Sequence, residues 1–253
     1  MPSTCRNFAV SLGALAMAAC SANTSPAPVS YSQVDMSEYI MAAVLSPARP
    51  AEDIARDEAR KPEEIVTFAS VQRGDVVAEI APGGGYYTRI LSQTVGAEGK
   101  VYALMPAFFA NRPGGLDGIN AIAERYGNVE VVVVEGYDTL SLPEPVDLVW
   151  TTENYHDLAN GNVAATNSWA YGALEPGGIY FVEDHAAPGT GLSATSTLHR
   201  IDPAAVRDQV TEAGFVLEAE SDLLRNPADP HDASPRDFGG VSDKFALRFR
   251  KPR

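Results

Sequence analysis

Positive charge and cysteine are both scarce in this sequence of 253 residues. Lysine and arginine number 19 against 33 aspartates and glutamates, so the formal net charge is −14. A chain this acidic repels the phosphate backbone of DNA and RNA, and we expect no nucleic-acid partner. The only cysteines are Cys5 and Cys20.

The first 20 residues resemble an export signal. Arg6 supplies a positive charge, and residues 8–19 form an apolar run too short to span a bilayer stably. Small residues precede Cys20, as in a bacterial lipobox, whose cysteine becomes the acylated first residue of the mature protein. An ordinary signal peptide cleaved nearby is the alternative. We therefore expect an exported protein on the periplasmic side of a bacterial envelope, held to the membrane only by a lipid on Cys20. Because Cys5 is then removed, no disulfide can form.

The rest of the chain is predicted to be a tether and one domain. Residues 21–49 begin with serine, proline, alanine and asparagine, and we predict a flexible tether there. The chain is 45% hydrophobic, which suffices for one well-formed core. Residues 50–253 are therefore predicted to form a single domain.

Apolar strands alternate with helices along this domain. Residues 50–69 are predicted to form two short helices that separate near Pro62. Strands are then predicted at 75–81, 100–105, 129–134, 146–151, 179–183, 215–223 and 244–250, and helices at 85–95, 116–126, 162–174 and 203–213. Near-continuous apolar strands indicate a parallel sheet covered on both faces. The last two strands follow each other without a helix, so they should pair antiparallel.

A glycine-rich turn follows the first predicted strand and has the pattern Glu79-x-Ala81-x-Gly83-x-Gly85. Consecutive glycines let the backbone approach a ligand and point N–H groups at it. A dinucleotide-binding fingerprint would need glycine in place of Thr88, and a phosphate-binding P-loop would need a lysine that is missing. A strand-to-helix turn without a ligand remains the alternative.

This pattern and the strand order resemble class I S-adenosylmethionine (SAM)-dependent methyltransferases over roughly residues 50–252. More narrowly, the chain is similar to a bacterial group of exported "predicted methyltransferase" proteins. The shared stretches are 60–62, 82–88, 99–103, 154–157, 174–178, 198–202 and 225–230. The resemblance implies an α/β, Rossmann-like fold with a mostly parallel seven-stranded sheet, an antiparallel terminal strand and helices on both faces. It also implies SAM as cofactor and methyl transfer to a small molecule or a cell-envelope component.

The resemblance implies a cofactor site along the carboxyl ends of the strands. Gly83 and Gly85 would lie under the methionine and ribose portions of SAM, and Glu79 would order the loop or accept a hydrogen bond from the amino group. Met105 stands at the end of the second strand, where most of the superfamily has an acid. Asp138 matches the acid that commonly approaches the adenine amino group, with a turn or capping role as the alternative. The predicted cofactor-binding residues are Glu79, Ala81, Gly83, Gly84, Gly85, Met105, Asp138 and Asn154.

All four histidines fall in segments that leave the carboxyl ends of predicted strands, where open α/β sheets bind ligands. His156 follows the strand 146–151 directly. We predict that it takes the proton of the methyl acceptor and that Asp157 orients it. Tyr155 and Asn154 would position substrate or hold the methionine end of SAM. The alternative is that Asn154 and Asp157 only cap the next helix.

Two other functions fit the same residues. A metal-assisted hydrolase would use His156, His185 and Asp184, completed by Asp157 or His231. No short H-x-x-x-H or C-x-x-C spacing supports this set, so we predict no metal ligand. The other function is that of a non-catalytic, ligand-binding lipoprotein on a methyltransferase scaffold.

Overall fold

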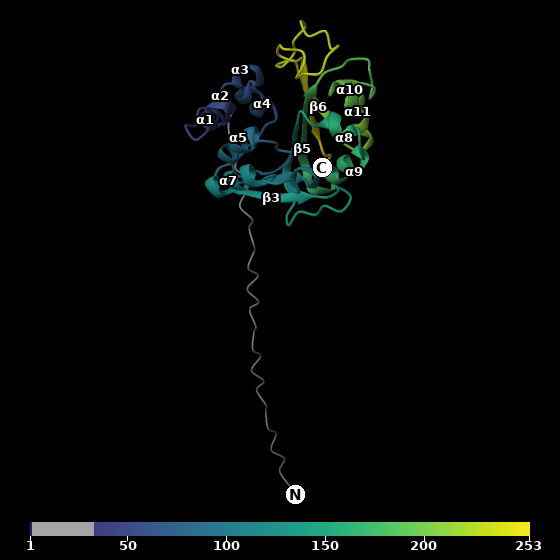
Figure 1. Cartoon of the computed structure of the whole chain (residues 1–253). Coiled ribbons are helices and arrows are strands. Elements are labelled where there is room, and N and C mark those ends of the chain that lie inside the picture. Colours follow the sequence, from purple (N-terminus) through teal and green to yellow (C-terminus); the bar gives the residue numbers. More distant parts are fainter. Residues whose placement is uncertain (2–32) are drawn as a thin grey trace. The chain divides into compact units, whose positions relative to one another are not determined.

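The computed structural model describes Met1 and residues 33–253. Its centre is a seven-stranded sheet in the order β3-β2-β1-β4-β5-β7-β6 (Figure 1). The strands are β1 (Val76–Ile80), β2 (Lys100–Pro106), β3 (Val129–Val134), β4 (Val146–Thr152), β5 (Leu174–His185), β6 (Val216–Ser221) and β7 (Lys244–Arg250). β1 to β5 run parallel to one another, whereas β7 runs antiparallel between β5 and β6. The predicted mixed sheet with an antiparallel terminal pair is confirmed.

Helices cover both faces of this sheet, as predicted (Figure 1). Those before and around the first strands are α1 (Gln33–Val44), α2 (Ala51–Ile54), α3 (Asp57–Arg60), α4 (Pro62–Phe68), α5 (Tyr86–Val95), α6 (Ala107–Ala110) and α7 (Asp117–Tyr126). The later ones are α8 (Tyr155–Ala159), α9 (Val163–Ala173), α10 (Thr195–Leu198) and α11 (Pro203–Glu212). No helix of the described segments is long and apolar enough to cross a membrane.

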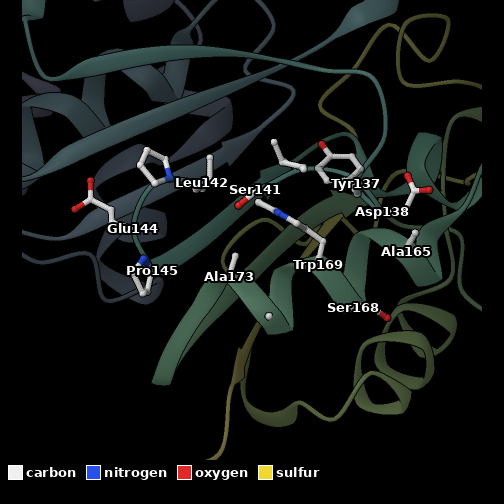
Figure 2. Close-up of a pocket in the computed structure, with 13 residues that line it drawn as sticks. Tyr137, Asp138, Ser141, Leu142, Glu144, Pro145, Ala165, Ser168, Trp169 and Ala173 are labelled. Carbon is white, nitrogen blue, oxygen red and sulfur yellow. The ribbon is translucent and has the colours of Figure 1, made fainter.

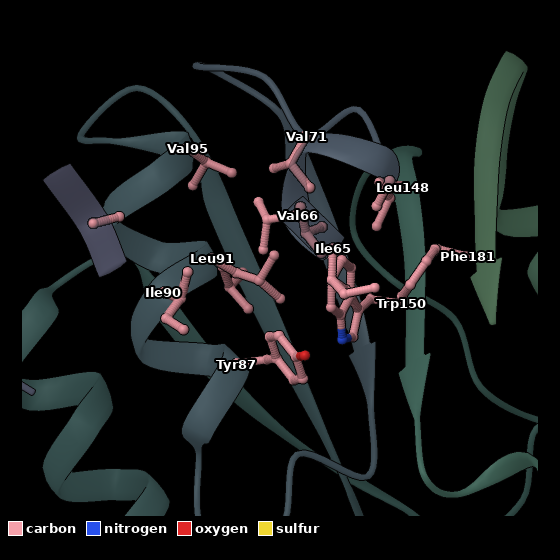
Figure 3. Packing of buried hydrophobic residues seen from close by; sticks show 14 of the residues in the cluster. Ile65, Val66, Val71, Tyr87, Ile90, Leu91, Val95, Leu148, Trp150 and Phe181 are labelled. Atoms are coloured by element: carbon pink, nitrogen blue, oxygen red, sulfur yellow. The ribbon is translucent and has the colours of Figure 1, made fainter. Parts of the chain in front are cut away.

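Each face of the sheet has its own hydrophobic core, because neighbouring residues of a strand point to opposite faces. Val77 and Trp150 belong to the core under α1, α4, α5 and α7, whereas Ala78 and Val149 belong to the core under α8, α9 and α11. Figure 3 shows the first core, where the Trp150 ring lies 4.3 Å from the Phe181 ring and 4.9 Å from the Tyr87 ring. These buried aromatic contacts fix the strands whose ends carry the site.

The predicted tether is wrong for residues 33–49. This segment begins with α1, whose Met36, Tyr39, Ile40 and Ala43 are buried against α4 and α5. Their i, i+3, i+4, i+7 spacing is the signature of an amphipathic helix, but the polar, proline-containing residues just before it suggested a tether. The predicted signal peptide and Cys20 lie outside the described residues.

The segment before β1 contains three short helices rather than the two predicted. The separation at Pro62 is confirmed, because Lys61 is left-handed with φ 43° and Pro62 begins α4. The extra break lies between α2 and α3, around Arg56. The Arg49 guanidinium holds this segment together through a two-hydrogen-bond ion pair with Asp57, at 2.6 and 2.8 Å.

Candidate functional site

The glycine-rich turn between β1 and α5 has a strained backbone. Ala81, Gly83 and Gly85 all have positive φ, of 50°, 57° and 80°. A left-handed conformation costs a non-glycine residue about 1–2 kcal/mol, and such outliers often mark a functional site. At Gly85 an added Cβ would lie 2.2 Å from Cδ1 of Ile122, so glycine is needed there for packing. At Gly83 an added Cβ would meet no protein atom within 4 Å, so this residue faces open space.

That open space is a cavity of about 410 Å³ at the carboxyl ends of β1, β2 and β4. It is lined by Ala81, Gly83, Met105, Pro106, Phe109, Arg112, Pro113, Gly115 and Asn154. Its volume is in the range of small-molecule sites. Four of the residues predicted to bind the cofactor, Ala81, Gly83, Met105 and Asn154, therefore line one cavity.

The Asn154 carboxamide connects two strand ends beside this cavity. Its Nδ2 donates to the carbonyl oxygen of Thr152 at 2.6 Å and to that of Ala81 at 3.1 Å. The preceding residue, Glu153, is also left-handed and forms ion pairs with Arg60 and Lys244. Together these contacts fix the turn that leaves β4.

The other predicted cofactor residues do not line the cavity. Glu79 is buried and accepts a hydrogen bond from Thr88 Oγ1 at 2.6 Å, so it joins β1 to α5. Burial raises the pKa of Glu79 to about 7, although the Thr88 hydrogen bond and the charge of Arg89 oppose the shift. Gly84 accepts a hydrogen bond from Arg89 through its carbonyl oxygen.

Asp138 lines a different cavity, of about 540 Å³. Figure 2 shows it with Tyr137 on the segment after β3, across from Ala165 and Trp169 of α9. The predicted adenine contact of Asp138 is therefore not supported by its position in this structure.

His156 is the centre of a separate cluster of side chains, which lies at the carboxyl ends of β4 and β5. Its imidazole is buried, and Nδ1 lies 2.8 Å from Oδ1 of the fully buried Asp184. Burial alone would lower the pKa of His156, but the Asp184 hydrogen bond and the nearby carboxylates outweigh burial, so the pKa is raised. Asp184, and not the predicted Asp157, orients the ring.

Asp157 instead lies near the other ring nitrogen. Its Oδ1 is 3.6 Å from Nε2 of His156 and 3.8 Å from Nδ1 of His199. The rings of His156 and His199 are 5.5 Å apart. The Asp157 and His199 side chains are 60% and 56% exposed, whereas His156 is 5% exposed. The cluster therefore opens to solvent on one side.

The other two histidines have separate partners. His185 Nδ1 lies 2.9 Å from Ser242 Oγ, and burial lowers the pKa of His185 to about 4. His231 Nε2 lies 2.8 Å from Oδ2 of Asp243. The four histidines therefore do not share one set of partners. The structure does not gather His156, His185 and Asp184, the hydrolase ligands considered from the sequence, into one group of metal ligands.

Tyr155 lies in the core rather than in either cluster. It is fully buried, and its hydroxyl accepts a hydrogen bond from Asn167 Nδ2 at 2.8 Å. Burial raises the pKa of this hydroxyl well above its usual value. Its position favours a structural role, and we do not include it among the proposed catalytic groups.

From the sequence, Asp184 was considered only as a metal ligand of a hydrolase and His199 only as one of four histidines at this edge, and neither was predicted to act with His156 in methyl transfer. Asp184 reaches His156 because β4 and β5 pair in parallel, with Thr152 opposite Glu183. In the sequence, Asp184 could have been recognised as a site residue because it forms, with Glu183, a pair of acids at the end of a predicted strand. His199 lies 43 residues after His156 in a loop, and no local pattern links the two.

The strand order, with β7 inserted antiparallel between β5 and β6 and a glycine-rich turn after β1, is that of the class I SAM-dependent methyltransferase fold. A SAM-dependent methyltransferase from Aquifex aeolicus superposes with a TM-score of 0.57 at 17% identity, over 87% of this chain and 99% of that one. The glycopeptide N-methyltransferase MtfA, complexed with SAM, gives a TM-score of 0.53 at 15% identity, over 78% and 87% of the two chains. These similarities establish the fold.

In sequence, the chain is 30% identical over 97 residues to a protein-L-isoaspartate O-methyltransferase from Ignicoccus hospitalis. The match covers 35% of this chain and 40% of that protein, so the chain spans less than half the length of this relative. No protein-family model matches the chain.

Proposed function

We propose that this protein transfers a methyl group from SAM to a small molecule or to a component of the cell envelope. The observation that carries the proposal is the cavity of about 410 Å³ over Ala81 and Gly83, at the carboxyl ends of β1, β2 and β4. In open α/β sheets, this edge is where ligands bind. The methyltransferase fold makes SAM the first ligand to consider.

The residues around the cavity offer groups for the adenine, carboxylate and amino portions of SAM. Gly83 leaves room for a ligand against the backbone, and Met105 and Phe109 give apolar walls for an adenine ring. Arg112 is the one charged side chain among the lining residues, and it would meet the SAM carboxylate. Asn154 would hold the amino group through its carboxamide oxygen, since its Nδ2 already donates to two carbonyls. When bound, SAM supplies an electrophilic methyl group.

The acceptor side of the proposal is the group formed by His156, Asp157 and His199. It begins two residues after Asn154 and opens to solvent. Methyl transfer needs an aligned acceptor and removal of its proton. These three side chains would orient the acceptor and assist that removal.

Calorimetric titration of the purified protein with SAM, and with its demethylated product, tests the cofactor part. We expect binding with a Kd below about 1 mM. Gly83→Leu, which fills the cavity, should weaken binding at least about tenfold. Gly127→Leu is the matched control, because Gly127 also has a positive φ, an added Cβ there likewise meets no atom within 4 Å, and the residue does not line this cavity. Absence of heat with the unmodified protein would rule the proposal out.

Binding without catalysis is the second candidate function, and one observation favours it: no carboxylate lines the cavity to hold the ribose hydroxyls. Incubation of the protein with methyl-labelled SAM and a bacterial envelope extract distinguishes catalysis from binding alone. Transfer of label by the unmodified protein, lost in His156→Ala while SAM still binds, supports catalysis. Binding of SAM with no transfer to any extract supports the second function.

We further propose that the protein is exported and lipid-anchored at Cys20. The support is the apolar run of residues 8–19 and the small residues before Cys20. In cells fed a labelled fatty acid, the label should be incorporated into the unmodified protein and not into the Cys20→Ser variant. Equal labelling of the unmodified protein and Cys20→Ser, or no labelling of either protein, would rule out a lipid anchor at Cys20.

A further inference from the structure

Three side chains beside the proposed acceptor site have the arrangement of a metal centre. His156, Asp157 and His199 each offer one donor atom, and these atoms all lie within 4.8 Å of one another. We propose that they bind one divalent first-row transition-metal ion. Two imidazoles and one carboxylate are a ligand set that Zn²⁺, Fe²⁺ and Co²⁺ accept. The proposal departs from the sequence expectation that no metal is bound.

Two of the three distances between donor atoms are close to those that a metal ion requires, and the third is no more than 4.8 Å. Donors bound at about 2.1 Å in a tetrahedral site lie about 3.4 Å from one another. Asp157 Oδ1 lies 3.6 Å from His156 Nε2 and 3.8 Å from His199 Nδ1. Small side-chain rotations of the two exposed residues would therefore close the set around an ion.

Asp184 prepares His156 to be a ligand. A carboxylate accepts hydrogen bonds, so His156 donates its Nδ1–H to Asp184, and the lone pair is left on Nε2, the nitrogen near Asp157. Asp184 also accepts the backbone N–H groups of His156 and His185, both at 2.7 Å, so it cannot turn away. In protein metal sites, a ligating imidazole usually donates its other N–H to a carboxylate of this kind.

The loop that carries His199 is fixed to the same edge of the sheet. Ile201 donates its N–H to the carbonyl of His185 and accepts from Ala187, both at 2.9 Å. Thr195 Oγ1 donates to Asn160 Oδ1 at 2.7 Å, which joins α10 to the end of α8. His199 itself is left-handed, with φ 51°. The two histidines are therefore held together before any ion binds, which lowers the entropy cost of binding.

The centre has the open form of a catalytic metal site. It supplies three protein ligands, two of them more than half exposed, so further positions remain for water or substrate. Two carboxylates, Asp157 and Asp184, would offset the charge of a divalent ion. With the ion bound, the lone pair of His156 Nε2 would be held by the metal, so removal of the acceptor's proton would depend on the ion rather than on a free imidazole. That the ion would hold a hydroxyl, amine or thiol of the methyl acceptor rests on the proposed function; the metal site itself does not.

Metal binding is measured on the tag-free protein after removal of metal by a chelator. Titration with Co²⁺ should give one equivalent bound, with visible absorption bands of a nitrogen- and oxygen-ligated ion that Zn²⁺ abolishes. His199→Ala and Asp157→Asn should each weaken Co²⁺ affinity on the order of 100-fold. His231→Gln is the matched control, because its partner is Asp243, and it should bind Co²⁺ like the unmodified protein.

Two results would overturn the metal site: less than stoichiometric Co²⁺ in the unmodified protein, or equal affinity in His199→Ala and His231→Gln. Circular dichroism of each variant checks that it is folded. Calorimetry with SAM on the metal-free protein keeps the two proposals separate. SAM binding without Co²⁺ binding rejects the metal site alone, and Co²⁺ binding without SAM binding rejects the proposed function alone.

Discussion

Asp184 holds His156 at two points. Its Oδ1 lies 2.8 Å from Nδ1 of the imidazole, and its Oδ2 accepts the backbone N–H of His156 at 2.7 Å. Asp184 is the next-to-last residue of β5, and His156 is the second residue of α8, which follows β4, so the parallel pairing of these strands creates the contact. The second ring nitrogen, Nε2, is thereby directed to the exposed side of the cluster.

Asp184→Asn should reduce both metal affinity and stability. An asparagine can present an N–H to Nδ1 and so favour the wrong imidazole tautomer. Loss of a carboxylate that accepts the N–H of a ligating imidazole typically weakens metal binding about 10- to 100-fold. Three hydrogen bonds to a buried carboxylate are also disturbed, so the free energy of unfolding should fall by about 1–3 kcal/mol. Co²⁺ competition titration and urea denaturation measure the two effects.

Asp208→Asn is the control for this change, since Asp208 is exposed on α11. It should alter stability by less than about 0.5 kcal/mol and leave Co²⁺ affinity as it is. Unchanged Co²⁺ affinity in Asp184→Asn would mean that the carboxylate does not support a ligand.

Asn154→Ala should weaken SAM binding without unfolding the domain. The change removes the two hydrogen bonds that fix Ala81 and Thr152, and it removes a polar group from the cavity wall. Loss of the hydrogen bond that the Asn154 oxygen would accept from the charged SAM amino group costs about 1.5 kcal/mol, so the Kd for SAM should rise about tenfold. Calorimetry measures it. Asn120→Ala, on the exposed side of α7, should bind SAM normally; an equal loss in both variants would contradict a local role.

The fold could be predicted from sequence because its signals are local. Apolar runs such as Val129–Val134 and breaks such as Pro62 each reflect the conformation of a few neighbouring residues. The order of such elements then restricts the topology. The prediction was wrong in α1, where proline and serine upstream outweighed a four-residue apolar stripe that becomes evident only when it packs on α5.

The candidate site was predictable only in part, for the same reason. Gly83 and Ala81 belong to one turn, and their pattern places a cavity after β1. The pairing of His156 with Asp184 depends on the β4–β5 register, and that of His156 with His199 depends on a loop anchored by Ile201. Such contacts across the sheet edge are decided by tertiary packing, which no single stretch of sequence encodes.

Glu79→Gln should remove a pH dependence of stability. In the folded protein burial raises the pKa of Glu79 from 4.5 to about 7, so between these values the folded state holds a proton that the unfolded state has released. The contribution of Glu79 to stability is therefore fully present below about pH 4.5 and is lost as the pH rises through about 7. A shift of this size corresponds to about 3 kcal/mol at most.

Urea denaturation of both proteins at about pH 5 and about pH 8 measures this. Glutamine can still accept the Thr88 hydrogen bond, so the variant should fold. From about pH 5 to about pH 8, the free energy of unfolding of the unmodified protein should fall relative to that of Glu79→Gln. A constant difference between the two proteins would show that Glu79 titrates alike in both states.

Asp229→Asn should be among the most destabilising single changes outside the cavity and the histidine cluster. Asp229 Oδ2 lies 2.9 Å from Nη2 of Arg200, and both side chains are fully buried. Asp229 also accepts the backbone N–H groups of His231 and Asp243, so it fixes the segment between β6 and β7. The change leaves a buried guanidinium without its counter-charge, which typically costs about 3–5 kcal/mol.

The exposed pair Arg207–Glu220 is the matched control for that ion pair, with the same kind of contact at 3.0 Å. Glu220→Gln should cost no more than about 1 kcal/mol, because water solvates the remaining charge. Arg200 adjoins His199, so Asp229→Asn should also loosen the loop that carries this ligand and weaken Co²⁺ binding, whereas Glu220→Gln should not. Equal unfolding free energies for the two variants in urea would show that the buried guanidinium finds other partners, such as the Ala233 carbonyl it already contacts at 2.8 Å.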